Sequence, residues 1–274
     1  MSRSLRRFLS SPLTVAALAV VVLLLVAAVF APQLATHQPT RQDFRAVLQP
    51  PSGAHYLGTD EIGRDIFSRV VFGARVSVTV GVLSVALGAL VGITIGLLAG
   101  FYGGALDGVL MRVIDVLLAF PGILLAILLA TALGAGLGPV IIAVAAYSVP
   151  TFARVMRGSV LAVRSREFVE AARAAGAGGG RLILKHVFLN SFSPVLVYAT
   201  LLMGGAILTA AALSFLGVGV APPTPEWGAM ISTARDYMRR APHVIVGPGI
   251  AIFLTVLSFN ILGDALRDAL DPKS

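Results

Sequence analysis

The residues that could carry out covalent chemistry are few in this sequence and are not grouped as a catalytic site requires. The chain has no cysteine, which excludes a disulfide framework, a thiolate metal site and a cysteine nucleophile. No paired carboxylates and no Ser/His/Asp grouping are present, so we expect no enzyme activity from this chain. The histidines are dispersed, no pair has the spacing of metal ligands, and we expect no metal site; they are His37, His55, His186 and His243.

Two pairs of opposite charges lie three positions apart near predicted helix ends. Arg112 and Asp115 form the first pair, and Asp264 and Arg267 form the second. Because residues i and i+3 share a helix face, we expect an ion pair within each. We favour a structural role for both pairs, with a gating contact as the alternative, since charges within a membrane often mark a transport path.

The segment 166–175 is rich in helix formers and is the most informative stretch of the sequence. Its apolar residues fall on one helix face: Phe168, Ala171, Ala172 and Ala175. Gly176 begins a glycine run that ends this helix. From the residues alone, the helix either inserts into a groove of a partner protein or lies on the lipid headgroups. The glycine run continues into Arg181-Leu182, without the Lys and Ser/Thr of a nucleotide-binding P-loop, so any ATPase must be another chain.

These segments belong to a chain that is too apolar for a water-soluble protein. Of its 274 residues, 57% are hydrophobic and 12% are charged, and the mean hydropathy is +0.91. Soluble proteins have about 25% charged residues, so a soluble enzyme is excluded, and disorder is excluded by the high hydrophobicity. In such a chain the net charge of +8 is no signal for nucleic acid, and we expect no nucleic-acid partner.

The charge-free runs predict an all-α integral membrane protein with six transmembrane helices, because about 20 apolar residues cross a bilayer as a helix. The expected helices are 12–32, 76–100, 111–133, 139–158, 192–216 and 244–263. A signal peptide is the alternative for the first, but its apolar core exceeds the roughly 15 residues of a signal sequence. Pro121 and Pro248 are expected to kink the third and sixth helices.

The basic residues orient these helices. In this topology thirteen of the 21 basic residues lie on the side of the N-terminus, so the positive-inside rule places both termini in the cytoplasm. The predicted divisions are a cytoplasmic tail at 1–11, a first helix at 12–32, an extracytoplasmic loop at 33–74, a transmembrane core at 75–264 and a cytoplasmic tail at 265–274. Within the core we expect a cytoplasmic loop at about 159–190 and an extracytoplasmic loop at 218–242.

Small residues recur at every fourth position of the second helix: Ser84, Gly88, Gly92, Gly96 and Gly100. Such a stripe lets two helices approach closely in lipid, and we favour packing within this chain over a contact with a partner subunit. In the loop 218–242 we expect a short helix through Arg240. Its Trp227 and Tyr237 suit the membrane interface, and a contact for a substrate-binding protein is the alternative.

Five ordered motifs resemble the ABC-importer permeases of the dipeptide/oligopeptide/nickel family. Glu170-Ala171-Ala172 followed by Gly176 resembles the EAA loop, the coupling helix that docks on the cognate ATPase. The segments 55–77, 110–121, 213–228 and 257–272 resemble other parts of these permeases, and the long loop after the first helix resembles the C-type subunit, as in dipeptide permease C. The chain departs from the family pattern at Leu189, where proline is usual.

The resemblance implies a type I importer fold, with one peripheral N-terminal helix and a five-helix core in the bacterial cytoplasmic membrane. It implies four partners besides the lipid: a second homologous permease, two ATPase subunits and an extracytoplasmic substrate-binding protein. ATP and Mg would bind the ATPases, and no cofactor is expected in this chain. The implied docking residues are Glu167, Glu170, Ala171, Ala172 and Gly176.

The resemblance implies short peptides as cargo, with nickel chelates, haem or a glutathione-like solute as alternatives. A self-sufficient secondary transporter or channel is the alternative from another functional class. No acid or histidine lies in the middle of the second, fourth or fifth helix, which argues against the proton relay of a secondary transporter.

Overall fold

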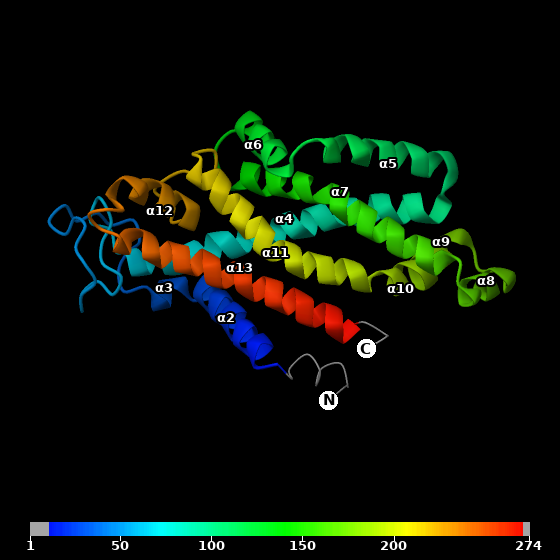
Figure 1. The fold of residues 1–274 in the computed structure, drawn as a ribbon, viewed down its shortest axis with the longest axis horizontal. Helices are drawn as coiled ribbons and strands as arrows, with labels where there is room; N and C mark the ends of the chain where they lie inside the picture. Colours follow the sequence, from blue (N-terminus) through cyan, green and yellow to red (C-terminus); the bar gives the residue numbers. More distant parts are fainter. Residues whose placement is uncertain (1–10, 271–274) are drawn as a thin grey trace.

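Long helices form most of the structure, a computed structural model that describes residues 11–270 (Figure 1). Five helices are long and apolar enough to cross a membrane: α2 (Pro12–Val29), α4 (Ile66–Tyr102), α7 (Leu137–Arg164), α11 (Ser193–Phe215) and α13 (His243–Leu270). A bent pair, α5 (Gly104–Ala119) and α6 (Gly122–Leu133), supplies a sixth candidate span. The shorter elements are α3 (Ala31–Leu34), α8 (Glu167–Ala174), α9 (Gly179–Arg181), the π-helical η1 (Leu182–Phe188), α10 (Leu189–Ser191), α12 (Trp227–Ala234) and the 3₁₀ turn η2 (Arg235–Tyr237). Nearly all of the predicted tail at 1–11 lies outside the described residues.

The third predicted helix, 111–133, is not one continuous helix. Its two parts meet at 89°, and Phe120 between them is extended, with ψ 134°. The cause is Pro121, which cannot donate a backbone hydrogen bond and disfavours helical geometry in the residue before it. The expected kink at Pro121 is therefore a full break, and the first part begins earlier than predicted, at Gly104.

The second helix also differs from its prediction, because α4 begins at Ile66 and not at 76. Asp65 caps it, and its carboxylate accepts a hydrogen bond from the Ser68 backbone N–H at 2.8 Å. Arg75 lies within the helix and donates from Nε to the Ala28 carbonyl, at the end of α2, at 2.9 Å. Arginines with such partners are tolerated in this helix, so the predicted loop 33–74 is shortened to 35–65.

Two other helices are longer than the apolar runs that predicted them. α7 continues to Arg164 and α13 to Leu270, where 158 and 263 were expected. The reason is that a helix can continue beyond the hydrocarbon core of the membrane, because its backbone hydrogen bonds also form in water. The predicted tail at 265–274 therefore starts within a helix. The prediction of a single helix at 192–216 is confirmed by α11.

The core of the bundle is the contact between α4 and α7. A Cβ atom on Gly92 would lie 2.5 Å from the Phe152 Cβ, and one on Gly96 would collide with the Ala153 carbonyl. Only glycine permits this separation of the two backbones. The small-residue stripe thus packs within the chain, as predicted.

Figure 1 places two groups of short elements at opposite ends of the bundle. The loop 35–65 and α12 lie at one end, and α8 and α9 lie at the other. α2 packs against α4 and α13 at the side of the bundle, which agrees with a peripheral first helix.

Candidate functional site

The helix predicted from 166–175 is present as α8, and one buried side chain anchors it. Val169 is 0% exposed and belongs to a cluster with Val163 of α7 and with Leu182 and Val187 of η1. α8 is therefore seated on the end of the bundle and does not hang free from a loop.

Gly176 ends α8 as predicted, through a Schellman motif. Its φ is +83°, and its N–H donates to the Arg173 carbonyl at 3.0 Å. The N–H of Ala177 donates to the Ala172 carbonyl at 3.1 Å. These two bonds satisfy the last carbonyls of the helix, and a side chain at Gly176 would have to adopt a left-handed backbone at a cost of about 1 kcal/mol.

The structure divides the predicted apolar face of α8 in two. Phe168, Ala171 and Ala175 are exposed, with Phe168 at 40%. Ala172 turns partly inward against the core cluster. The exposed part is a small apolar surface at the tip of the molecule, and Glu167 and Glu170, both exposed, lie in the first turn, where acidic side chains suit the helix dipole.

The segment after α8 returns to the bundle as a continuous series of helical turns. Leu189, which takes the place of the family proline, has φ −59° and ψ −37° and is 63% exposed. The Asn190 side chain donates to the His186 carbonyl at 2.7 Å. The change at Leu189 therefore leaves the corner between η1 and α11 helical.

The predicted ion pair between Arg112 and Asp115 is wrong. Asp115 accepts a hydrogen bond from Arg154 of α7, with 2.7 Å between Nη2 and Oδ1. A neighbouring pair joins Arg157 of α7 to Asp107 of α5. Because α5 packs along α7, these cross-helix partners replace the local one, and no ion pair of Arg112 occurs within residues 11–270.

The second predicted pair does not form either. Asp264 and Arg267 make no ion pair with each other in the described part of α13. Arg267 instead lines a groove of about 430 Å³ between α7, α11 and α13, with Tyr198 and Leu201 among its apolar walls.

At the opposite end of the bundle, Trp227 is buried inside the protein, so its ring is not available to face a membrane interface as predicted. It is 2% exposed, and its Nε1 donates to the Val70 carbonyl at 2.9 Å. Gly73 of α4 makes room for the indole ring, since a Cβ there would be 2.6 Å from it. Trp227 is a core residue, whereas Tyr237 in η2 is half-buried.

Glu226 caps α12 beside this tryptophan. Its carboxylate accepts a hydrogen bond from the Ala229 N–H at 2.8 Å, and the residue is 4% exposed. Burial raises the pKa of Glu226 above its ordinary value, and the hydrogen bonds from Ala229, Gly228 and Ser214 offset only part of that rise.

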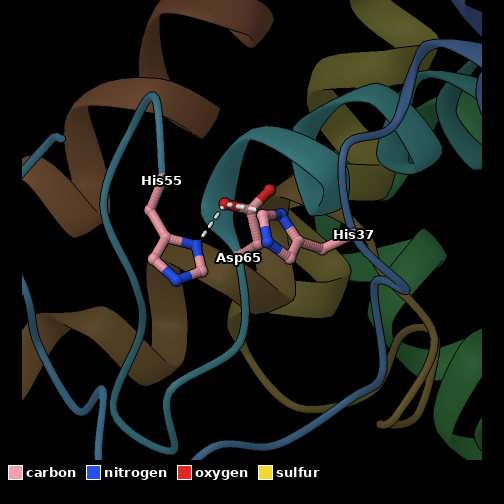
Figure 2. Close-up of side chains that lie close together, drawn as sticks. All are labelled: His37, His55 and Asp65. Atoms are coloured by element: carbon pink, nitrogen blue, oxygen red, sulfur yellow. Dashed lines mark hydrogen bonds and ion pairs between the residues drawn. The ribbon is translucent and has the colours of Figure 1, made fainter. Parts of the chain in front are cut away.

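Two of the histidines that are dispersed in the sequence come together in the structure. His37 and His55 flank Asp65, with the rings 4.6 Å apart between centroids (Figure 2). The His55 Nδ1 lies 2.9 Å from the Asp65 Oδ1, and the His37 Nδ1 lies 3.8 Å from the same oxygen. The sequence spacing of the histidines, from which we expected no metal site, did not indicate this contact.

Asp65 is the centre of that group and is almost fully buried. Burial acts to raise its pKa, but hydrogen bonds from Ser68 and His55 and the charge of His37 outweigh it and leave the pKa below the ordinary value. His37 lies eighteen positions before His55, and no predicted helix or strand between them fixes their separation. The contact therefore depends on how the loop folds, which the sequence pattern does not specify.

Two regions of the chain match known protein families. Residues 92–274 match the family described as binding-protein-dependent transport system inner membrane component. Residues 1–51 match the N-terminal transmembrane domain of oligopeptide transport permease C.

Among the similar proteins are several called glutathione transport system permease protein GsiD. The protein of Escherichia coli O6:K15:H31 is 49% identical over 269 residues, which covers 98% of this chain and 89% of the relative. The protein of Shigella flexneri serotype 5b is 51% identical over the same coverage.

Two solved structures share the fold at low identity. A chain of the MetNI methionine ABC transporter in an inward-facing conformation has a TM-score of 0.61 and 18% identity, covering 74% of this chain and 97% of its own length. An amino acid ABC transporter with histidines has a TM-score of 0.58 and 16% identity, covering 74% and 95%.

Proposed function

The chain belongs to the family of binding-protein-dependent transport system inner membrane components, and from this membership we propose that it forms, with a second homologous permease, the pathway of an ATP-driven importer. It has the type I importer permease fold of an ABC transporter and is a C-type subunit of the oligopeptide permease group. Its place is a membrane that it crosses several times, beside ATPase and binding-protein subunits. In the proposal two ATPases bind ATP and Mg, and this chain itself is not catalytic.

The proposed cargo is a short peptide of about the size of glutathione. The observation that carries this choice is the 49% identity, over nearly the whole chain, to permeases named for glutathione transport. Glutathione is itself a tripeptide, so it lies within the peptide class that the sequence motifs imply. Nickel chelates and haem are the alternatives from the same family.

The proposed docking surface for an ATPase is the exposed part of α8, formed by Phe168, Ala171 and Ala175. Small residues beside an exposed aromatic ring suit insertion into a groove, because they allow close approach of the backbones. Glu167 and Glu170 border this surface. Ala172 and Gly176 act differently: they hold the helix in place through the core contact and the Schellman motif.

The proposed coupling runs from α8 into the bundle. Val169 packs against the end of α7, and Arg154 and Arg157 of α7 are paired with α5. A push on α8 would thus reach α7, α5 and the α4 contact as a rigid-body movement that opens the pathway alternately to either side.

The experiment is transport by the reconstituted complex in proteoliposomes, with this chain, its partner permease, the ATPases and the binding protein. We expect ATP-dependent uptake of labelled glutathione or of short peptides. Ala171→Trp should keep the chain in the membrane and lower uptake about 5- to 150-fold, because a clash of about 1–3 kcal/mol weakens docking by that factor. Arg173→Trp, on the opposite side of α8, is the matched control and should retain uptake.

Two outcomes would overturn parts of the proposal. Uptake that proceeds without any ATPase would establish a self-sufficient transporter and reject the importer mechanism. ATP-dependent uptake of nickel chelate or haem, with none of peptide or glutathione, would reject the cargo and leave the mechanism standing.

A further inference from the structure

A second group of functional side chains lies at the end of the bundle opposite α8, and the importer mechanism does not use it. We propose that His37, His55 and Asp65 form a binding site for a divalent transition-metal ion of the Zn²⁺ class. Two imidazoles and a carboxylate are a donor set typical of zinc sites. Their possible ligand atoms all lie within 4.8 Å of one another.

The distances between the donor atoms suit a single ion. Bonds of about 2.0–2.1 Å in a tetrahedral site place neighbouring ligand atoms about 3.3 Å apart. The Asp65 Oδ1 lies 2.9 Å from one imidazole Nδ1 and 3.8 Å from the other, on either side of that value. All the possible ligand atoms lie within 4.8 Å of one another, so rotations of the side chains would bring the two rings and the carboxylate to ligand distance. Figure 2 shows both rings beside Asp65.

The carboxylate is already oriented for this role. Its second oxygen, Oδ2, accepts hydrogen bonds from the Ser68 N–H at 2.8 Å and from the Thr36 hydroxyl at 3.4 Å. These bonds fix the carboxylate and leave Oδ1 toward the two rings, as outer partners do for metal-binding carboxylates.

The backbone beside His37 is held in place as well. Its N–H donates to the Ser68 hydroxyl at 3.0 Å, which ties this part of the loop to the first turn of α4. The Thr36 hydroxyl also lies 3.0 Å from the His37 Nδ1. When that nitrogen binds a metal, the hydroxyl still has Asp65 as an acceptor, so no polar group loses its partner.

Space and charge at the site favour a cation with an open coordination position. The three side chains border a polar cavity of about 220 Å³, which is large enough for an ion with a water ligand. Asp43 also lines the cavity and offers a second carboxylate, whereas Arg41 supplies one opposing charge. The accessible ring is His37, with 38% of its side chain exposed, and Asp65 forms the buried floor at 1%.

The donor set also selects the kind of metal. Imidazole nitrogens suit Zn²⁺, Ni²⁺ and Cu²⁺, whereas Ca²⁺ and Mg²⁺ require mostly oxygen ligands. A bound ion would join two separate parts of the loop 35–65, at His37 and at His55, to Asp65 at the start of α4. We therefore expect it to stabilise this end of the molecule.

The test uses the full chain in detergent, with an affinity tag that contains no histidine and after treatment with a chelator. Zn²⁺ is titrated in competition with a chromophoric chelator, and the apparent unfolding temperature is measured with and without Zn²⁺. We expect one equivalent of Zn²⁺ per chain, a higher unfolding temperature with the ion, and no displacement by millimolar Ca²⁺ or Mg²⁺.

Single variants locate the ion. His37→Ala and His55→Ala should each weaken Zn²⁺ binding at least about 10-fold and remove the thermal shift. His186→Ala, at the other end of the bundle, should change neither quantity. Because His37 is partly exposed, its variant should fold with an unchanged unfolding temperature in the absence of metal, which separates loss of a ligand from loss of structure.

Either of two results would overturn the site. One is the absence of stoichiometric Zn²⁺ binding to the wild-type chain. The other is binding that is equally tight in His37→Ala and His55→Ala, which would place the ion elsewhere.

Discussion

Arg157 of α7 holds Asp107 of α5 through two hydrogen bonds, from Nε and from Nη2, each 2.6 Å long to a separate carboxylate oxygen. This fork-to-fork contact joins the first turn of α5 to the half of α7 that leads into α8. Arg154 and Asp115 repeat the connection further along the two helices. Together the two pairs join α5 to α7 at two points along their length.

Arg157→Lys should lower the stability of the chain by about 1 kcal/mol, because a lysine cannot make the paired hydrogen bonds of a guanidinium. Asp115→Asn is the comparison, since its pair is more exposed, at 57% and 50%, and should contribute less. The measurement is the apparent unfolding temperature in detergent, with about 2–4 °C expected per kcal/mol. Equal shifts in both variants would contradict a special role for the paired geometry.

Gly92→Ala should separate α4 from α7 and destabilise the chain by about 1–3 kcal/mol, since the added methyl overlaps the Phe152 side chain. Gly158→Ala provides a matched control on α7 itself. Its new Cβ meets nothing within 4 Å, so the substitution should be neutral or stabilising by up to about 1 kcal/mol, the helix preference of alanine over glycine. Unfolding temperatures of the two variants relative to wild type decide the question. A Gly92→Ala protein as stable as Gly158→Ala would show that the two helices can move apart at no cost.

The sequence was sufficient to locate the apolar helices. Predictions from it were wrong where a helix boundary or an ion pair depends on contacts with a segment distant in the sequence. The boundaries of α11 agree with the prediction to within one residue, because a charge-free run is a local property. The start of α4 was missed because the partners of Arg69 and Arg75 lie in distant segments, the Pro39 carbonyl and the end of α2. The dipeptide Phe120-Pro121 did signal the break between α5 and α6, but the run of apolar residues through it favoured one helix.

The candidate sites show the same limit. Gly176 could be assigned to the end of α8 from the sequence because a helix stop is local. The partner of Asp115 is 39 positions away, so its spacing from Arg112 was a poor guide. His37 and His55 come together only because the loop 35–65 folds back on the start of α4. The spacing of residues in the sequence does not predict the conformation of such an irregular loop.

Glu226→Gln should remove a pH dependence of stability. Since burial raises the pKa of Glu226 in the folded chain above its unfolded value, the folded state holds that proton more tightly. Its contribution to stability is then fully present below the unfolded pKa and is lost as the pH rises through the folded pKa. The glutamine oxygen can still accept from the Ala229 N–H, so the variant should gain stability relative to wild type as the pH increases.

The measurement for this prediction is the unfolding temperature of both proteins at a series of pH values from about 4 upward. Glu167→Gln, an exposed glutamate in α8, is the control and should run parallel to wild type. Parallel curves for wild type and Glu226→Gln would show that the carboxyl is not penalised by its burial.

The orientation of the chain in the membrane can be tested by cysteine labelling. Because the sequence contains no cysteine, a single introduced cysteine is the only thiol in the chain. Gly53 lies in the loop 35–65 and Gly178 lies between α8 and α9, and an added Cβ would meet nothing within 4 Å at either position. Both are exposed, so single substitutions to cysteine should leave the fold intact. The positive-inside rule predicts that Gly178 is cytoplasmic and Gly53 is not.

A membrane-impermeant maleimide should therefore label Gly53→Cys in cells with a permeabilised outer envelope, and should label Gly178→Cys only in inverted vesicles. The two cysteines control for each other, since each reports reagent access where the other is protected. The reverse pattern would place α8 outside the cell, where no ATPase could reach Phe168 and Ala171. That single outcome would reject α8 as the coupling helix, whatever its fit to a groove, whereas the expected pattern places the exposed surface of α8 on the side where ATP is available.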